Sequence, residues 1–225
     1  MLLLAVDTAT PAVTAALHDG ESVVAESSRV DARRHGELLL PAIDRVLAEA
    51  GVKIDAVTAV VTGVGPGPYT GLRVGLVTAA TFGSALDVPV YGLCTLDGLA
   101  HASDLDGPFV VATDARRKEV YWARYDASGN RVGEPAVDRP ADIAEQVAGL
   151  PAVGAGARLY PDVFPDARDP EHVSAGALAS LAVRKLAVRK LAGGTEEMDF
   201  LPPQPLYLRR PDAQVPKNYK VVTPK

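Results

Sequence analysis

The chain has 225 residues, 48% of them hydrophobic, and its 23 basic and 28 acidic side chains give a formal net charge of -5. A chain of this size and hydrophobicity buries one large core or two small ones, which excludes intrinsic disorder and makes two lobes the expectation. The acidic balance argues against affinity of the whole surface for nucleic acid or for an anionic membrane. Any contact with RNA therefore has to be local.

The cysteine content and the N-terminus together predict a cytoplasmic protein. The single cysteine, Cys94, excludes an intramolecular disulfide and a cysteine-rich zinc site, and it is typical of a reducing compartment. The chain opens on an apolar run that ends at Asp7 and has no basic leader. This run is too short for a signal peptide or a membrane span, so we expect it to form a buried strand.

The first half of the chain predicts three strands, followed by helices and strands in alternation. Asp19-Gly20 is a turn pair between the second and third strands, because both residues tolerate positive φ. Gly51 supplies the stop of the first helix, and Thr70 and Thr95 are the expected caps of the next two. The expected strands are residues 2–6, 13–17, 22–26, 57–62 and 88–91, and the expected helices are residues 37–50, 70–86 and 95–102.

The second half repeats this order. Its expected strands are residues 109–113, 120–125, 132–137 and 152–153, and its expected helices are residues 141–147 and 174–191. Each half thus begins βββαβα, the order found in the two ribonuclease-H-like lobes of the actin-like ATPase superfamily, an α/β class with mixed sheets covered by helices. The turn-rich segment 103–108 separates an expected N-terminal lobe, residues 1–104, from a C-terminal lobe, residues 105–210, with a flexible tail over 211–225.

Two segments of the first half are candidates for contact with a nucleotide or another anion. In the actin-like fold an aspartate after the first strand commonly faces a phosphate or its magnesium ion, and Asp7 and Thr8 occupy that place. The segment lacks the glycine that lets a backbone approach a phosphate closely, which favours a simple strand-end turn. In the following loop, Gly65, Gly67 and Thr70 precede a helix and predict outward amides that bind an anion, although a purely structural turn has the same composition.

The sequence predicts neither a catalytic residue nor a metal site. The four histidines, His18, His35, His101 and His172, are scattered without a pair at helical spacing. Cys94 has no histidine or basic residue beside it, and a thiol at a strand end usually behaves as a small buried hydrophobe.

Small residues four apart mark one side of the helix expected at 70–86. Gly71, Gly75, Ala79 and Gly83 form a stripe almost without side chains. Because each glycine costs a helix about 1 kcal/mol relative to alanine, three of them indicate close approach of another helix, with the first helix as one candidate. The remaining apolar side chains exceed what one sheet covers, so we also expect an exposed partner-binding surface. Its expected residues are Leu72, Gly75, Leu76, Ala79 and Phe82, with Leu39 and Ile43 of the first helix.

Three segments of the first half resemble the TsaB family. They are residues 4–10 (LAVDTAT), 35–41 (HGELLLP) and 65–75 (GPGPYTGLRVG), of which the last is the most specific. The second half adds Asp114-Ala115-Arg116, Glu119-Val120-Tyr121 and, near the end, PLYLR at residues 205–209. The resemblance covers nearly the whole chain but not residues 210–225.

The resemblance implies a non-catalytic subunit in threonylcarbamoyl transfer to adenosine 37 of tRNAs that read ANN codons. It implies that the chain binds a TsaD homologue, works with a TsaE homologue, reaches tRNA through the complex and forms a homodimer in isolation, using its first-lobe helices. No cofactor is expected to bind tightly, and ATP or ADP would bind only at a composite interface with partners. The catalytic relative TsaD holds a metal through a closely spaced histidine pair, and in that region this chain offers only His101.

Two alternatives are kept beside the TsaB interpretation. An autonomous actin-like-fold ATPase or small-molecule kinase would need an adenosine-binding glycine pair in the second lobe, for which only Gly154 and Gly156 come near. A stand-alone metallopeptidase would need a metal site, and the scattered histidines argue against one.

The last residues of the chain are locally basic on an acidic protein. The charged side chains there are Arg209, Arg210, Lys217, Lys220 and Lys225 against Asp212. This tail is a candidate for contact with tRNA or with an acidic face of a partner, and a solvated disordered tail is the alternative.

Overall fold

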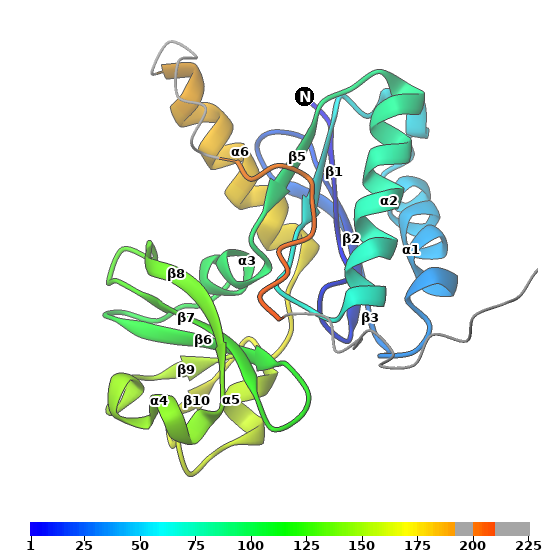
Figure 1. The fold of residues 1–225 in the computed structure, drawn as a ribbon. Helices are drawn as coiled ribbons and strands as arrows, with labels where there is room; N and C mark the ends of the chain where they lie inside the picture. The colour runs from blue at the N-terminus through cyan, green and yellow to red at the C-terminus, as the bar shows by residue number, and fades with distance from the viewer. Residues whose placement is uncertain (192–199, 210–225) are drawn as a thin grey trace, which may run out of the picture.

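The computed structural model describes residues 1–191 and 200–209, which fold into two lobes that each contain a five-stranded mixed sheet (Figure 1). The predicted tail, residues 211–225, lies outside the described residues, as does Arg210; of the basic side chains near the end of the chain, Arg209 is described. Within the described part, none of the helices is both long and apolar enough to cross a membrane.

The first sheet has the strand order β3-β2-β1-β4-β5. Strand β1 pairs antiparallel with β2 and parallel with β4, which in turn pairs parallel with β5. The strands are β1 (Leu3–Asp7), β2 (Ala12–His18), β3 (Val23–Val30), β4 (Ala59–Gly63) and β5 (Val90–Leu93).

The second sheet has the order β10-β9-β6-β7-β8. Strand β6 pairs antiparallel with β7 and parallel with β9, which in turn pairs parallel with β10, as in the first sheet. The strands are β6 (Phe109–Asp114), β7 (Val120–Tyr125), β8 (Arg131–Asp138), β9 (Ala152–Val153) and β10 (Ala167–Arg168). The duplicated fold with mixed sheets is therefore confirmed. The short helix α5 (Ala155–Leu159) and the two-residue strand β10 were not predicted, because so few residues carry no periodic pattern.

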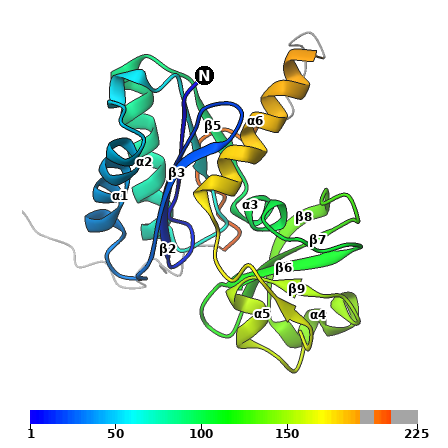
Figure 2. The same cartoon turned by 180° about the vertical axis from the view of Figure 1, so that it is seen from behind.

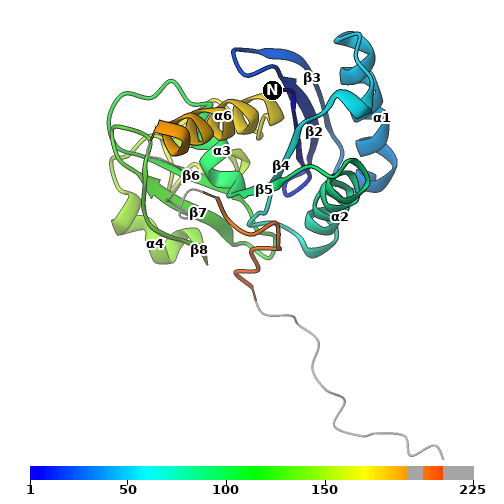
Figure 3. The same cartoon turned by 90° about the horizontal axis from the view of Figure 1, so that it is seen from above.

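Helices cover both faces of the first sheet, as the view from behind and the view from above show (Figures 2 and 3). Helices α1 (His35–Glu49) and α2 (Tyr69–Leu86) lie on one face, and α3 (Thr95–His101) and α6 (Ala175–Leu191) lie on the other. Side chains alternate along β1, so Leu4 packs toward α1 while Leu3 packs into the core shared with α3, α6 and the second sheet. Helix α4 (Pro140–Val147) and α5 cover the outer face of the second sheet.

Helix α6 packs on the first sheet although it follows the second lobe in the chain. Ala175 N–H donates to Thr14 Oγ1 (3.1 Å) and the Ser174 hydroxyl donates to Glu26 Oε1 (2.8 Å), so the start of the helix is fixed to β2 and β3. The assignment of residues 105–210 to the C-terminal lobe is therefore wrong for this helix. Periodicity shows that a helix has an apolar face but does not show which sheet covers that face.

Residues 200–209, which we call the C-terminal strap, return to the first lobe. The strap forms one antiparallel bridge with β5, and Leu206 N–H donates to the Val64 carbonyl (2.8 Å). At its end Arg209 forms an ion pair with Glu119, which lies between β6 and β7 of the second lobe. The strap therefore connects the two lobes.

Two predicted helix caps are wrong. Helix α2 begins at Tyr69 after Pro68, and α3 begins at Thr95 after Cys94, so neither Thr70 nor Thr95 is a cap. The Thr95 hydroxyl has another partner, described below. Helix α1 begins two residues earlier than predicted, and Gly51 follows it with φ of 66°, as expected for a helix stop.

Candidate functional site

Asp7 lies at the end of β1, completely buried beneath the loop between β4 and α2. Its Oδ1 accepts a hydrogen bond from Ala9 N–H (2.7 Å), and its Oδ2 accepts one from the Thr95 hydroxyl (2.6 Å). Thr95 Oγ1 in turn accepts from Gly65 N–H (3.2 Å). Burial raises the pKa of Asp7 to about 6, against the lowering effect of these two hydrogen bonds. The carboxyl group thus links β1, the loop and α3 rather than facing the solvent.

The Thr8 hydroxyl is bound into helix α2. It donates to the Gly71 carbonyl (2.7 Å) and accepts from Gly75 N–H (2.9 Å), two groups that pair with each other in a regular helix. A Cβ atom on Gly75 would lie only 2.7 Å from Thr8 Oγ1. The close approach of the β1 end to α2 therefore requires glycine at this position.

The glycine stripe of α2 consequently faces the protein's own sheet. Gly71 and Gly75 contact Thr8, and Gly83 lies against Val90 of β5. The prediction that another helix approaches this stripe holds only at Gly71, which also lies against His35 at the start of α1, and is wrong for Gly75 and Gly83. A spacing of four shows that one side of a helix lacks side chains, and either a helix or a sheet can approach such a side.

The loop before α2 is turned inward. Gly65 has φ of 98° and lies against Leu72, and Gly67 approaches the Ala9 carbonyl so closely that no Cβ atom fits between them. Of the five residues predicted to contact a nucleotide or anion, four are buried and only Thr70 is exposed. The predicted outward nest of amides is therefore wrong for Gly65, whose N–H group points to Thr95.

A cavity of about 320 Å³ lies beside this network, between the first turns of α1 and α2 and the loop that joins β6 to β7. Thr70 lines the cavity from α2, Arg33 from the segment before α1, and Arg116 from the second lobe. His35 also lines it, and its Nε2 lies 2.8 Å from the Thr10 carbonyl, to which a protonated Nε2 donates.

Sequence reasoning did not select the two arginines of this cavity as site residues. The backbone at Arg116, Arg117 and Lys118 has left-handed φ angles, between 55° and 63°, which residues other than glycine rarely adopt. Arg116 forms an ion pair with Asp114 (3.4 Å), which lines the same cavity. The available signal was that Arg116 lies within one of the motifs of the resemblance and Arg33 just before another.

The structure buries most of the residues predicted to form the partner-binding surface. Leu72 and Leu76 pack with Ala9 and Val64, and Leu39 and Ile43 lie in the core beneath α1. Gly75 and Ala79 are buried as well, and Phe82 is half-buried against the same core. These side chains are therefore not an exposed rim, because they face the sheet that α1 and α2 cover. Other residues make up the outer face of α2, among them Val77, which is 63% exposed.

Of the groups considered for catalysis or metal binding, Cys94 is buried and His101 is half-buried. Cys94 is buried, and burial raises the pKa of its thiol to about 12. Burial and the nearby Arg184 lower the pKa of His101. Among residues 1–191 and 200–209, no three histidine, cysteine, aspartate or glutamate side chains are grouped so that they could hold a metal ion.

Comparison with known proteins assigns the chain first to a broad class. The family model described as "TsaD: tRNA N6-adenosine threonylcarbamoyltransferase" matches residues 23–217. The solved structure described as "YeaZ from Pseudomonas aeruginosa" aligns with a TM-score of 0.75 and 30% identity, over 92% of this chain and 99% of that chain. The chain thus shares the fold of the YeaZ structure and belongs to the family that the TsaD model describes.

Individual relatives define the family more narrowly. The tRNA threonylcarbamoyladenosine biosynthesis protein TsaB of Escherichia coli is 33% identical over 174 residues, which cover 72% of this chain and 75% of that protein. A protein of Mycobacterium tuberculosis described as uncharacterized is 43% identical over 216 residues, 94% of this chain and 93% of that protein. The chain therefore belongs to the TsaB family, as the sequence motifs predicted.

Proposed function

We propose that this protein is a non-catalytic, cytoplasmic subunit required for threonylcarbamoyl transfer to adenosine 37 of tRNAs that read ANN codons. Its membership of a family whose members are named for tRNA threonylcarbamoyladenosine biosynthesis carries the proposal. The packed state of Asp7, Thr8 and Cys94 supports a non-catalytic role, because their polar atoms are held in internal contacts.

The purified chain alone is the first test of this proposal. It is expected to transfer no threonylcarbamoyl group to a tRNA transcript and to hydrolyse ATP no faster than a buffer control. Transfer by the isolated chain would contradict the non-catalytic role. ATP hydrolysis by the isolated chain would favour the alternative of an autonomous actin-like ATPase or kinase.

For the partners, we propose that a TsaD homologue docks on the outer face of α2 and that a TsaE homologue joins the resulting complex. Val77, Ala80, Thr81, Ser84 and Ala85 line a shallow groove of about 480 Å³ on this face. Their side chains are small, so a helix of the partner can approach closely. In isolation the same face would pair with a second copy of the chain. A specific interface typically buries about 1,600 Å² in total, and this groove would form its centre.

Two substitutions on α2 test this docking surface. Val77→Glu and Ala80→Glu place a charge on exposed positions of the groove, and each is expected to weaken binding of the TsaD homologue at least tenfold in light-scattering titrations. Val132→Glu is the matched control, because Val132 is an exposed valine (52%) on β8 of the second lobe. Wild-type binding by both α2 variants would show that TsaD docks elsewhere.

We further propose that the chain holds no tightly bound cofactor and that ATP or ADP binds only at a composite interface with its partners. The internal hydrogen bonds of Asp7 and Thr8 support this proposal, because neither side chain is free to face a phosphate or its magnesium ion. Isothermal titration of ATP and ADP into the chain alone is expected to give no heat of binding, and titration into the complex with TsaD and TsaE is expected to give one. Micromolar binding by the chain alone would contradict the proposal.

A further inference from the structure

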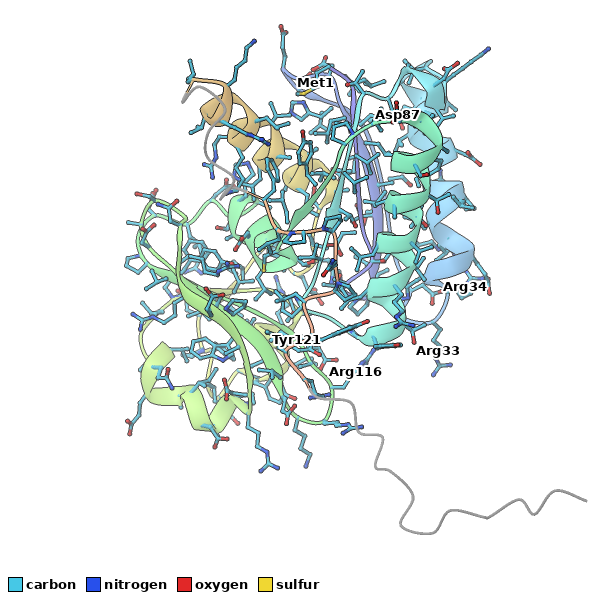
Figure 4. All side chains as sticks on the ribbon, turned by 45° about the horizontal axis from the view of Figure 1, so that its top comes forward. Met1, Arg33, Arg34, Asp87, Arg116 and Tyr121 are labelled. Carbon is cyan, nitrogen blue, oxygen red and sulfur yellow. The ribbon has the colours of Figure 1, made fainter. Side chains whose placement is uncertain are left out.

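Basic and aromatic side chains from four distant parts of the sequence meet at one end of the molecule. Arg33 and Arg116 line the same cavity from opposite lobes, and Figure 4 places both beside the first turn of α2. On that turn the Tyr69 ring stacks on Tyr207 of the C-terminal strap, with a centroid distance of 5.3 Å. The guanidinium group of Arg73 lies 4.0 Å from the centroid of the Tyr69 ring. We call these five residues the basic-aromatic strip.

The strip differs from the rest of this acidic protein in its charge. Among the described residues, no carboxylate forms an ion pair with Arg33 or Arg73, and Arg73 Nε instead donates to the Tyr207 hydroxyl (3.4 Å). Asp114 neutralises Arg116 in part (3.4 Å), and neighbouring Arg34 is paired with Asp31 (3.0 Å). On a chain with a net charge of -5, this excess of positive charge is local to the strip, and it favours the approach of a polyanion there over other parts of the surface.

The tyrosines add a second, independent feature. Tyr69 is 53% exposed and Tyr207 is 44% exposed, although rings of this size are usually buried when they serve only packing. Exposed aromatic rings among arginines are typical of surfaces that bind unpaired nucleic acid, where the rings stack on bases and the arginines contact phosphates. An acidic peptide would pair with the arginines but would have no specific use for the rings.

The sequence continues the positive charge beyond the strip. The described chain leaves the strip at Arg209, and the residues that follow in the sequence contain Arg210, Lys217, Lys220 and Lys225 with one acidic residue, Asp212. From these observations we propose that the basic-aromatic strip is an RNA-binding surface on this subunit, which contacts the phosphates and an unpaired base of the tRNA. This inference rests on the proposed function, because that function brings tRNA to the complex.

The test is tRNA binding by the full chain in complex with the TsaD homologue, measured by fluorescence anisotropy with a labelled, unmodified tRNA transcript at several salt concentrations. The triple variant Arg33→Gln/Arg73→Gln/Arg116→Asn is expected to lower the affinity at least tenfold at physiological salt. It should also reduce the slope of log affinity against log salt by about 2, since each phosphate contact contributes about 0.7 for single strands. Asparagine is chosen at position 116 because it tolerates left-handed φ.

A matched triple variant controls for net charge. Arg45→Gln/Lys53→Gln/Arg124→Gln removes three exposed cations outside the strip and is expected to leave both the affinity and the slope near the wild-type values. Tyr207→Ala is expected to lower the affinity about fivefold or more with an unchanged slope, because stacking is worth about 1–3 kcal/mol per base. Tyr207→Phe keeps the ring and should bind like the wild type. Circular dichroism checks that each variant is folded.

The outcomes separate this inference from the proposed function. If the strip variants bind TsaD normally and their tRNA affinity and slope equal those of the wild type, the strip does not bind RNA and the inference is overturned while the proposed function stands. If polyglutamate competes with tRNA as strongly as an unlabelled transcript does, and Tyr207→Ala has no effect, the strip binds acidic protein and the inference also fails. If the wild-type chain neither binds TsaD nor supports modification, the proposed function itself fails.

Discussion

The titration of Asp7 gives a quantitative test of whether the loop between β4 and α2 covers this carboxyl group in solution. Its folded-state pKa of about 6 lies above the ordinary value of 3.8 because the carboxyl group is buried. A rise of about two pKa units means that the ionised carboxylate is disfavoured by about 3 kcal/mol relative to the protonated acid. The contribution of this group to stability is therefore fully present below pH 3.8 and is lost as the pH rises through about 6.

The Asp7→Asn variant isolates this effect. Asparagine has nearly the same shape but does not titrate, so the difference in unfolding free energy between wild type and variant should change with pH. From pH 7 to pH 5 the wild type is expected to gain about 1.3 kcal/mol relative to the variant, in urea unfolding followed by circular dichroism.

A difference between wild type and Asp7→Asn that stays constant from pH 5 to pH 7 would refute this reasoning. It would mean that Asp7 reaches water in solution and that the loop over β1 is open. In that case the carboxylate would again be available to face a phosphate or a magnesium ion, and the proposal of a chain without its own nucleotide site would lose its structural support.

Two further predictions concern the packing of α2 against β1 and of the core around α3. Gly75→Ala is expected to lower the unfolding free energy by about 1–3 kcal/mol, because its methyl group would collide with the Thr8 hydroxyl that bridges β1 and α2; an unchanged urea midpoint would contradict the close approach. Cys94 is expected to resist iodoacetamide in the folded protein and to react after unfolding in urea, because its thiol is buried and its pKa is raised to about 12. Rapid alkylation of the native protein, followed by mass spectrometry, would show that the core around α3 opens readily.

Hydrophobic patterning was sufficient to predict most elements and the duplicated topology. The apolar runs of β1 and β4 and the helical periodicity of α1 depend on local sequence alone, and the same order of elements in both halves indicates the same lobe twice. The placement of α6 was predicted incorrectly, because its contacts with Thr14 and Glu26 join residues about 150 positions apart. Such contacts leave no trace in a local pattern.

In the candidate site, too, contacts between residues distant in sequence could not be predicted from local patterns. For Asp7 and Thr8 the sequence left a nucleotide contact and a strand-end turn as alternatives, because their hydrogen-bond partners, Thr95 and the backbone of α2, are distant in sequence. Leu72 and Leu76 were placed on a partner surface because helical spacing shows an apolar side without showing what covers it. The strip at Arg33, Arg116 and Tyr207 was not predicted, since only the fold brings its parts together.

The most direct test of the account is reconstitution of tRNA threonylcarbamoyladenosine formation with purified components. An unmodified transcript of a tRNA that reads an ANN codon is incubated with threonylcarbamoyl adenylate and the TsaD and TsaE homologues, with or without this chain, and the modified nucleoside is quantified by mass spectrometry. The modified nucleoside is expected to form only when the chain is present, at wild-type levels with Val132→Glu and at strongly reduced levels with Val77→Glu. Equal modification with and without the chain would contradict the proposal that it is a required subunit.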